Sequence, residues 1–232
     1  MYNITDINNK KGLLSYLGSF LSENRKKRFE KVLDYRTRHI TVAIEDVYKD
    51  RNASAIVRTA DCFGIQDVHI IENLNEYKLS SVAAKGSDKW INISVYDRDE
   101  HNTHSCLRKL KSRGYSIVAT TPHKNDQLLD EIDVSQKMAL IFGGEKDGLS
   151  ELVMNEADSF LKIPMVGFTE SFNISVASGI ILHNITKKLR ESDIPWQLTE
   201  QEKNVLRLDW TIKTVQNADQ LIRRFVEMES VE

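Results

Sequence analysis

A glycine-rich turn near residue 143 is the first place where this chain of 232 residues could do chemistry. The segment Ile141-Phe-Gly-Gly-Glu-Lys-Asp-Gly-Leu-Ser150 follows an apolar run and precedes a stretch with helical spacing. Glycine lets backbone N–H groups approach a ligand closely, so such a turn can hold a nucleotide. Its spacing matches neither common phosphate-binding glycine motif, and the Glu145 carboxylate would repel a pyrophosphate. The turn therefore suits a cationic or neutral ligand, although a glycine-rich turn taken alone is more often structural.

Two further segments carry polar side chains where a predicted strand or loop runs into a predicted helix. In the first, Asn52-Ala-Ser-Ala-Ile-Val-Arg58, Asn52 and Arg58 frame the start of a helix after a β-rich run at 40–44. The second, Ile163-Pro-Met-Val-Gly-Phe-Thr-Glu-Ser-Phe-Asn-Ile-Ser-Val-Ala177, is a loop with proline and glycine that enters a helix from Asn173. Each segment by itself is weak evidence of a site.

A basic cluster lies between Asn24 and Arg38, although the net charge of the whole chain is -2. This segment has a local net charge of +5, from the seven cations Arg25, Lys26, Lys27, Arg28, Lys31, Arg36 and Arg38 against two acidic residues. Such a cluster is as often a solvated helix face as a binding surface for a polyanion. Helical spacing allows Arg25, Arg28 and Arg36 to share one exposed face, opposite the apolar residues of the same helix.

The elements that must position these residues follow from hydrophobic periodicity and turn residues. Helices are predicted at both ends of the chain: over 10–22, through the basic cluster with Ser22 as the cap at its start, and over 199–228. Between them, strands alternate with helices, which indicates an α/β domain with a mostly parallel sheet. The predicted strands are 40–44, 68–71, 91–96, 115–120, 138–142 and 160–163, and the predicted helices are 52–62, 101–112, 149–156 and 173–190.

Composition narrows the class of protein. Apolar residues make up 41% and charged residues 28%, which is typical of a globular chain and excludes collagen-like and disordered proteins. No apolar run approaches the ~20 residues that a membrane span needs. Residues 1–6 lack the apolar core of a secretory signal, and the chain has only two cysteines, Cys62 and Cys106. We therefore expect a protein of the reducing cytoplasm, without a membrane partner.

Taken together and in this order, the three segments around Asn52, Gly143 and Ile163 resemble the three motifs of the SpoU family of RNA ribose methyltransferases. Within it the chain resembles the TrmH branch most, over about residues 24–190. The likeness includes the basic cluster, Glu45-Asp-Val-Tyr-Lys before the first motif, and Lys85-Gly-Ser-Asp-Lys-Trp90. It weakens before residue 24 and after residue 191.

The resemblance implies a SPOUT-type α/β domain whose C-terminal segment is threaded into a trefoil knot. It divides the chain into a basic, RNA-binding helical extension at 1–39, the methyltransferase domain at 40–190 and a helical extension at 191–232. It also implies a homodimer that uses S-adenosylmethionine, with no metal. The implied reaction is methylation of the 2'-hydroxyl of a guanosine in the D-loop of tRNA, at position 18 in the family.

Residues that match the family's motifs are assigned by this resemblance. Catalysis and site architecture are assigned to Asn52, Arg58, Glu145, Ser171 and Asn173. Cofactor binding is assigned to Thr120, Gly143, Gly144, Glu145, Gly148, Ile163, Met165, Ser171 and Phe172. RNA binding is assigned to Arg25, Arg28, Arg36 and Arg38, and to a second basic group at Lys187, Lys188 and Arg190.

The role of Arg58 stays open between two alternatives. The family's proposal is that it activates the ribose hydroxyl, but a guanidinium, with a pKa above ~12, rarely gives up its proton. The other role is to grip a phosphate beside the ribose and stabilise charge as the hydroxyl attacks.

Other functions remain as alternatives to the D-loop reaction. A relative of the same family could methylate ribosomal RNA or a different tRNA nucleotide, since the three motifs are shared. A protein that only binds RNA is a second class, although the intact motif residues count against it. A nicotinamide dehydrogenase is a third, and the missing G-x-G-x-x-G motif counts against it.

Overall fold

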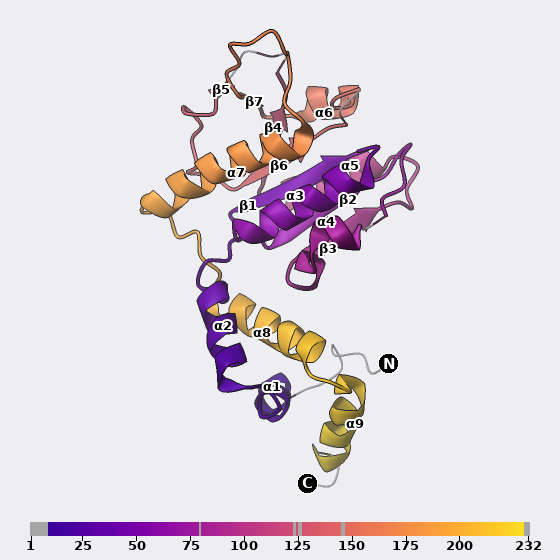
Figure 1. The fold of residues 1–232 in the computed structure, drawn as a ribbon, viewed down its shortest axis with the longest axis vertical. Helices are drawn as coiled ribbons and strands as arrows, with labels where there is room; N and C mark the ends of the chain where they lie inside the picture. The colour runs from indigo at the N-terminus through magenta and orange to yellow at the C-terminus, as the bar shows by residue number, and fades with distance from the viewer. Residues whose placement is uncertain (1–8, 79, 123, 125–126, 145–146, 230–232) are drawn as a thin grey trace. The chain divides into compact units, whose positions relative to one another are not determined.

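The chain folds into two compact units in a computed structural model (Figure 1). The helical unit consists of residues up to Arg36 together with residues from Leu198, and the α/β unit is Thr37–Gln197. The functional roles predicted for residues 52–58, 141–150 and 163–177 remain predictions. The structure describes residues 9–78, 80–122, 124, 127–144 and 147–229.

Capped helices form the helical unit. The side chains of Asn9, Ser22 and Thr199 each accept a hydrogen bond from a backbone N–H in the first turn, which is the usual role of a helix cap. Ser22 was predicted as such a cap, and this is confirmed. The helices are α1 (Lys10–Gly18), α2 (Glu23–Leu33), α8 (Glu200–Thr214) and α9 (Ala218–Glu229).

The helical stretch predicted over residues 199–228 is two helices in the structure. The chain leaves α8 at Val215, whose backbone is extended, and Asn217 adopts a left-handed φ of 54° before α9 begins. Asparagine tolerates this conformation better than other residues with a side chain. The turn allows Ile222 and Phe225 of α9 to pack with Leu13 and Leu17 of α1.

A seven-stranded sheet forms the centre of the α/β unit, in the order β3-β2-β1-β6-β4-β7-β5. Every pair of neighbouring strands is parallel, which confirms the predicted sheet. The knotted path of the chain stays a prediction of the family resemblance. The strands are β1 (Ile40–Glu45), β2 (Asp67–Ile71), β3 (Asn92–Tyr96), β4 (Ser116–Thr120), β5 (Gln127–Leu128), β6 (Met138–Phe142) and β7 (Ser159–Lys162).

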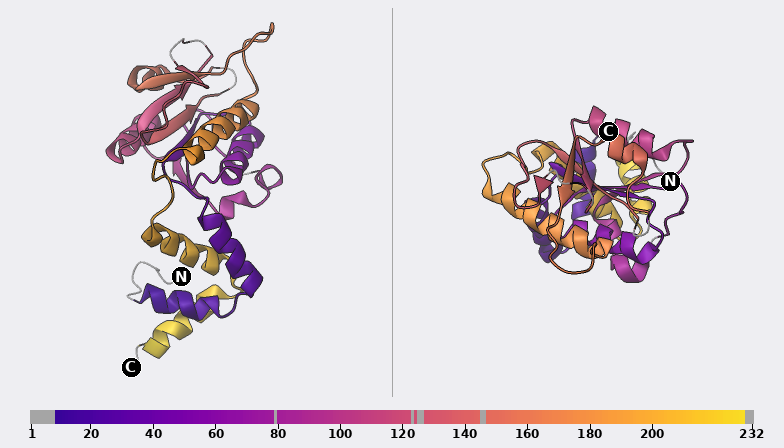
Figure 2. Two further views of the ribbon diagram at one scale, coloured as in Figure 1. Left: turned by 90° about the vertical axis from the view of Figure 1, so that its left-hand side faces the viewer. Right: turned by 90° about the horizontal axis from the view of Figure 1, so that it is seen from above.

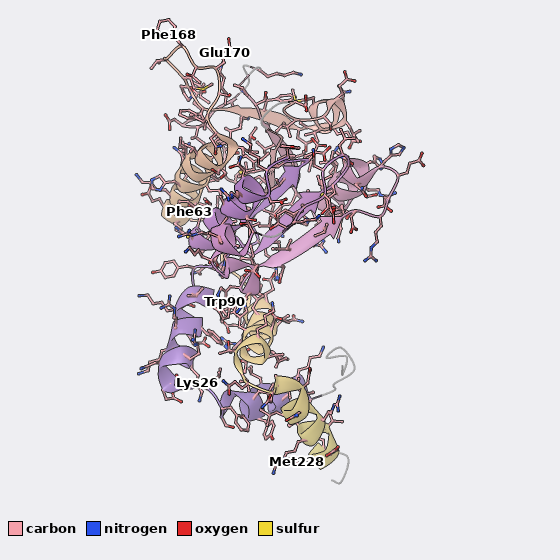
Figure 3. All side chains as sticks on the ribbon, turned by 45° about the vertical axis from the view of Figure 1, so that its right-hand side comes forward. Lys26, Phe63, Trp90, Phe168, Glu170 and Met228 are labelled. Atoms are coloured by element: carbon pink, nitrogen blue, oxygen red, sulfur yellow. The ribbon has the colours of Figure 1, made fainter. Side chains whose placement is uncertain are left out.

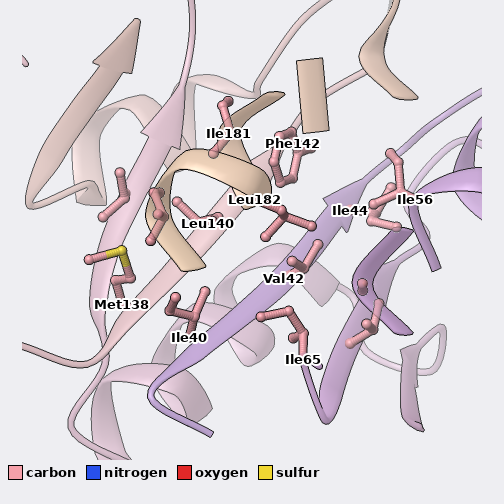
Figure 4. Packing of buried hydrophobic residues seen from close by; sticks show 14 of the residues in the cluster. Ile40, Val42, Ile44, Ile56, Ile65, Met138, Leu140, Phe142, Ile181 and Leu182 are labelled. Carbon is pink, nitrogen blue, oxygen red and sulfur yellow. The ribbon is translucent and has the colours of Figure 1, made fainter. Parts of the chain in front are cut away.

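Helices cover both faces of this sheet, which makes three layers (Figure 2). On one face α3 (Asp50–Cys62) and α7 (Ile174–Glu191) pack on Val42 and Ile44 of β1 (Figure 4). On the other face α5 (Asn102–Ser112) and α6 (Glu151–Glu156) pack on alternate residues of the same strands. The strands are therefore buried on both sides, which explains their nearly continuous apolar sequences.

Three short elements were not anticipated from the sequence. They are the one-turn helix α4 (Ser81–Ala84), the 3-10 helix η2 (Ser87–Lys89) and the two-residue strand β5. Elements of two to four residues are too short to show a hydrophobic period, so the sequence carries no signal for them.

A buried histidine on β2 makes stability depend on pH. His69 is buried, its Nδ1 lies 3.0 Å from the Tyr96 hydroxyl, and burial lowers its pKa to about 4. The unfolded chain therefore binds a proton at His69 as pH falls through ~6.5, whereas the folded chain does so only near pH 4, so folding stability is lost as pH falls across this window.

We expect His69→Gln to remove this part of the pH dependence. Between pH 7 and pH 5 the wild-type chain should lose ~2 kcal/mol more unfolding free energy than the variant, because its unfolded state alone gains the proton. Urea unfolding at the two pH values measures both losses. Equal losses in the two proteins would contradict the assignment.

Candidate functional site

A pocket opens where strands β4 and β7 end and α7 begins. Ligands of parallel α/β sheets bind outside the carboxyl ends of the strands, and this pocket lies there. Five of the residues predicted to bind the cofactor line it, namely Thr120, Ile163, Met165, Ser171 and Phe172. Its other lining residues are Thr121, Pro122, Leu161, Ala177 and Ile181.

The pocket wall is mostly apolar, with a few hydroxyl groups. Thr120 Oγ1 donates a hydrogen bond of 2.8 Å to the Ile141 carbonyl, which ties the end of β4 to β6. The Thr121 amide donates to the Leu161 carbonyl at 3.1 Å, which closes the wall toward β7. None of the described lining side chains is charged, so the pocket suits a flat, neutral group held by backbone and hydroxyl contacts.

Thr121 directly follows the predicted residue Thr120, and the other four lining residues were missed by sequence reasoning. Ala177 and Ile181 lie one turn apart on α7, and this spacing of four residues after Asn173 is the signal that could have found them. Leu161 was assigned only to a strand, and Pro122 only follows one. Their place in the pocket depends on which strands are neighbours, which no local pattern shows.

The glycines of the turn are required by the way the loop closes on itself. Gly144 and Gly148 form an isolated bridge, in which the Gly148 amide donates to the Gly144 carbonyl at 3.0 Å. A Cβ at Gly143 would lie 2.3 Å from the backbone of Gly148, and Gly148 itself has a φ of 69°. The pocket lining described above does not include these glycines. Their predicted contact with the cofactor stays a prediction, and Glu145 lies outside the described residues.

Helix α3 carries the first motif, and the packing of its buried residues determines which side chains of the motif face solvent. Ile56 and Val57 are fully buried against the sheet, and the helical phase then turns Arg58 outward. Arg58 makes no ion pair or hydrogen bond with any residue that the structure describes. Asn52 is half-buried in the first turn, where its backbone N–H donates to the Lys49 carbonyl at 2.8 Å. The guanidinium of Arg58 is therefore available to an external anion.

The third motif combines a pocket residue with a helix cap. Ser171 lines the pocket, whereas the Asn173 Oδ1 accepts hydrogen bonds from the amide and the hydroxyl of Ser175 and caps α7. Asn173 thus sets where α7 begins and, through it, where Ala177 faces the pocket. The contact of Asn173 with a substrate stays a prediction.

The loop that enters α7 presents apolar side chains to solvent. Phe168 and Glu170 lie at its far end, away from the sheet (Figure 3). Val166 and Phe168 are fully exposed, Phe172 is 43% exposed and Val176 of the first helical turn is 49% exposed. Apolar side chains grouped on a surface in this way are typical of sites that contact another molecule.

The basic cluster of α2 divides into exposed and buried cations. Arg25, Arg28 and Lys31 are exposed along the helix. The prediction that Arg36 shares their exposed face is wrong, because Arg36 is only 1% exposed and its guanidinium lies 5.4 Å from the ring centre of Trp210. The reason is that α2 ends at Leu33, so the helical phase used for that prediction does not extend to Arg36.

The remaining predicted RNA contacts belong to the α/β unit. Arg38 forms an ion pair of 2.9 Å with Asp67, and the amino group of Lys188 donates to the backbone carbonyls of the turn at 129–132. Arg190 donates to the Phe63 carbonyl at 2.7 Å. Lys187 is exposed, and within the described part of the chain nothing pairs with it. Their contact with RNA stays a prediction.

The residues that the structure describes contain no group of three or more His, Cys, Asp or Glu side chains placed to hold a metal ion. They also contain no helix that is long and apolar enough to cross a bilayer.

Comparison with protein-family models defines the class of protein. Residues 39–183 match the model described as the SpoU rRNA Methylase family. These residues cover most of the α/β unit, including the pocket, the glycine loop and α3. The chain belongs to this family.

Individual relatives extend the match beyond the family domain. The chain is 41% identical over 204 residues to the tRNA (guanosine(18)-2'-O)-methyltransferase of Borreliella burgdorferi, covering 88% of this chain and 92% of that one. It is similar to the crystal structure of the Aquifex aeolicus TrmH/SpoU tRNA modifying enzyme, with a TM-score of 0.73, 32% identity, and coverage of 83% of this chain and 98% of that one. An AdoMet-bound rRNA methyltransferase from Sinorhizobium meliloti has a TM-score of 0.59 and 27% identity, covering 67% and 58%.

Proposed function

We propose that this protein transfers a methyl group from S-adenosylmethionine to the 2'-hydroxyl of the D-loop guanosine of tRNA. The match to the Borreliella burgdorferi enzyme, whose name states this reaction at guanosine 18, carries the proposal. Because 204 matched residues exceed the length of the α/β unit, the match includes part of the helical unit as well. A shared methyltransferase domain alone would leave the RNA substrate open, whereas a match of both units favours the same substrate.

The pocket suits the proposed cofactor. Its apolar wall, from Leu161 and Ile163 to Ile181, fits an adenine ring, and the hydroxyls of Thr120 and Ser171 add polar contacts. The glycine loop that continues β6 offers backbone groups for the amino-acid end, as the family motif implies. The AdoMet-bound state of the Sinorhizobium meliloti relative supports this fit. When bound, S-adenosylmethionine supplies a methyl group on a positively charged sulfur.

The chain's own residues bind and orient the RNA in this proposal. Arg58 grips a phosphate next to the target ribose, which brings the 2'-hydroxyl toward the pocket and stabilises charge as the hydroxyl attacks. As the oxygen–methyl bond forms, the sulfur–methyl bond breaks, and the hydroxyl proton passes to the gripped phosphate. Asn52, Glu145, Ser171 and Asn173 complete the site at the loops around it. A guanidinium that holds a phosphate keeps its own proton, so this role agrees with its chemistry better than the role of a base does.

Nucleoside mapping tests the reaction. The protein is incubated with methyl-labelled S-adenosylmethionine and a tRNA transcript, and the methylated nucleoside is identified after digestion. We expect 2'-O-methylguanosine at position 18, and no label in a matched transcript with 2'-deoxyguanosine there. Label in ribosomal RNA or at another tRNA nucleotide would show that the substrate is different from the one proposed. If no RNA is methylated, the protein only binds RNA.

Arg58→Ala should abolish methyl transfer while the affinity for S-adenosylhomocysteine stays within a few-fold, because Arg58 faces outward from α3. The loss of one group that stabilises transition-state charge lowers the rate by ~10²–10³-fold. Arg51→Ala, an exposed arginine in the first turn of the same helix, is the matched control and should retain activity. If the Arg58→Ala variant keeps more than half of the wild-type turnover, the role assigned to Arg58 is wrong.

We further propose that the exposed face of α2 binds the tRNA backbone. Arg25, Arg28 and Lys31 lie within one arc of the helix, and each contact between a cation and a phosphate releases counterions from the RNA. The chain's net charge of -2 gives no overall attraction for RNA, so a local surface of this kind must provide it.

Replacing Arg25, Arg28 and Lys31 by alanine together should raise the KM for tRNA and flatten its salt dependence. Each lost phosphate contact lowers the slope of log affinity against log salt by roughly 0.7–0.9. Arg36→Ala is the contrasting variant, since its buried side chain should affect the unfolding free energy and not the slope. Titrations at several salt concentrations measure both, and an unchanged slope in the triple variant would show that α2 is only a solvated face.

A homodimer is part of the proposal, supported by the exposed apolar loop. A second copy of the chain would cover Val166, Phe168 and Phe172, which are costly to leave in water. Sedimentation should show a dimer for the wild type and a shift toward monomer for Phe168→Glu, with Lys187→Glu as a control outside the loop. A wild-type monomer at micromolar concentration would contradict this part.

We propose the cytoplasm as the place of action. The substrate is tRNA in this proposal, and both cysteines are free thiols in the structure, as a reducing compartment keeps them.

A further inference from the structure

A buried carboxylate at the end of β1 holds the residue at which the glycine loop ends. Glu45 is 2% exposed and accepts three hydrogen bonds. Two come from Ser150, through its amide at 2.9 Å and its hydroxyl at 2.8 Å, and the third comes from the Thr103 hydroxyl of α5 at 2.6 Å. Two segments distant in the sequence are therefore joined through one side chain.

The hydrogen atoms of this network leave Glu45 with acceptor roles alone. The Ser150 hydroxyl accepts from the Val153 amide at 3.2 Å and donates its own hydrogen to Glu45. The Thr103 hydroxyl accepts from the Asn73 side-chain amide at 2.9 Å and likewise donates to Glu45. Glu45 thus serves three donors at once through its two carboxylate oxygens. A glutamine of the same shape has one acceptor oxygen and no charge, so the hydroxyls of Ser150 and Thr103 would have to turn their hydrogens away and accept from its NH₂ group.

The glycine loop is held at both of its ends as a result. At its start, Phe142 of β6 pairs with Ile44 of β1 in the parallel register. At its end, Ser150 is bound to the next residue of the same strand, Glu45, and caps α6. Between these ends, the carbonyl oxygen of Asp46 lies 3.2 Å from where a Cβ of Gly144 would be. Strand β1 thus sets the height of the loop above the sheet.

Asp46 is itself held in place by the neighbouring loop. Its φ of 53° is left-handed, and its carboxylate accepts hydrogen bonds from the amides of Asn73, Leu74 and Asn75. Both acidic residues are therefore anchored to segments outside the glycine loop. Together they form the base on which the glycine loop lies.

We propose that Glu45 is a positioning residue for the cofactor, acting through Ser150 to keep the glycine loop at the height that S-adenosylmethionine binding requires. The inference rests on the proposed function, because it assigns a task to a residue of the same site. Because Glu45 is buried below the loop, it acts in this proposal without touching the cofactor or the RNA.

The test compares Glu45→Gln with Asp158→Asn, using S-adenosylhomocysteine as the probe in calorimetry. Asp158 is the matched control, since its carboxylate accepts from the Ile117 amide at 2.7 Å and lies just beyond the other end of α6. Both variants should unfold at a lower temperature, because in each a neutral amide replaces a carboxylate as the acceptor and the hydrogen bond loses its charge assistance. Only Glu45→Gln should weaken the affinity for S-adenosylhomocysteine, by about 10- to 100-fold, and raise the KM for S-adenosylmethionine while the KM for tRNA stays unchanged.

Variants of Ser150 show whether the effect passes through this residue. Ser150→Ala should weaken the same affinity, and its effect should not add to that of Glu45→Gln in the double variant. Ser150→Thr keeps the hydroxyl and a good helix cap, so it should restore wild-type affinity. This pair also decides the matter if Glu45→Gln does not fold, because equal affinities for Ser150→Ala and Ser150→Thr would overturn the proposal.

Two other outcomes distinguish failure of this inference from failure of the proposed function. If Glu45→Gln and Asp158→Asn lower the unfolding temperature alike and both bind S-adenosylhomocysteine as the wild type does, Glu45 is only structural and the inference fails while the proposed function stands. If the wild-type chain itself binds no S-adenosylhomocysteine, the proposed function fails, and this inference falls with it.

Discussion

The parallel pairing of β6 with β1 on one side and β4 on the other is the constraint on which the site depends. The glycine loop continues β6, so its position follows from this register. Thr120 of β4 donates to the Ile141 carbonyl beside the pocket, and Glu45 of β1 holds Ser150 where the loop ends. A slip of one residue would turn every side chain of β6 to the opposite face and separate these groups.

In the proposed function, the cofactor and the polyanion bind to different parts of the chain. The pocket of the α/β unit is apolar with hydroxyl groups, which suits a ligand held by shape and backbone contacts. The exposed cations of α2 belong to the helical unit. This division explains how a chain with a net charge of -2 can belong to a family of RNA-modifying enzymes, since phosphate binding depends on local and not total charge.

Cations of the same type have different surroundings in this structure. Arg28 is exposed, Arg36 lies under Trp210, and Lys188 binds the carbonyls of a nearby turn. Each was assigned to RNA binding as a basic residue in a region covered by the family resemblance. A buried guanidinium over an aromatic ring stabilises the helical unit through packing as well as charge. Charge density in the sequence therefore locates a basic region without showing which of its members reach solvent.

The sequence by itself determined the α/β class, the parallel sheet, most helices and strands, and the cap at Ser22, because these depend on local periodicity and on side chains a few residues apart. It also located the glycine loop and the motif residues Arg58 and Ser171. The pairing of Glu45 with Ser150, 105 residues apart, was decided only by the tertiary structure. So was the burial of Arg36. Both depend on which strands and helices become neighbours, and that is settled by the packing of the whole chain, which no local pattern records.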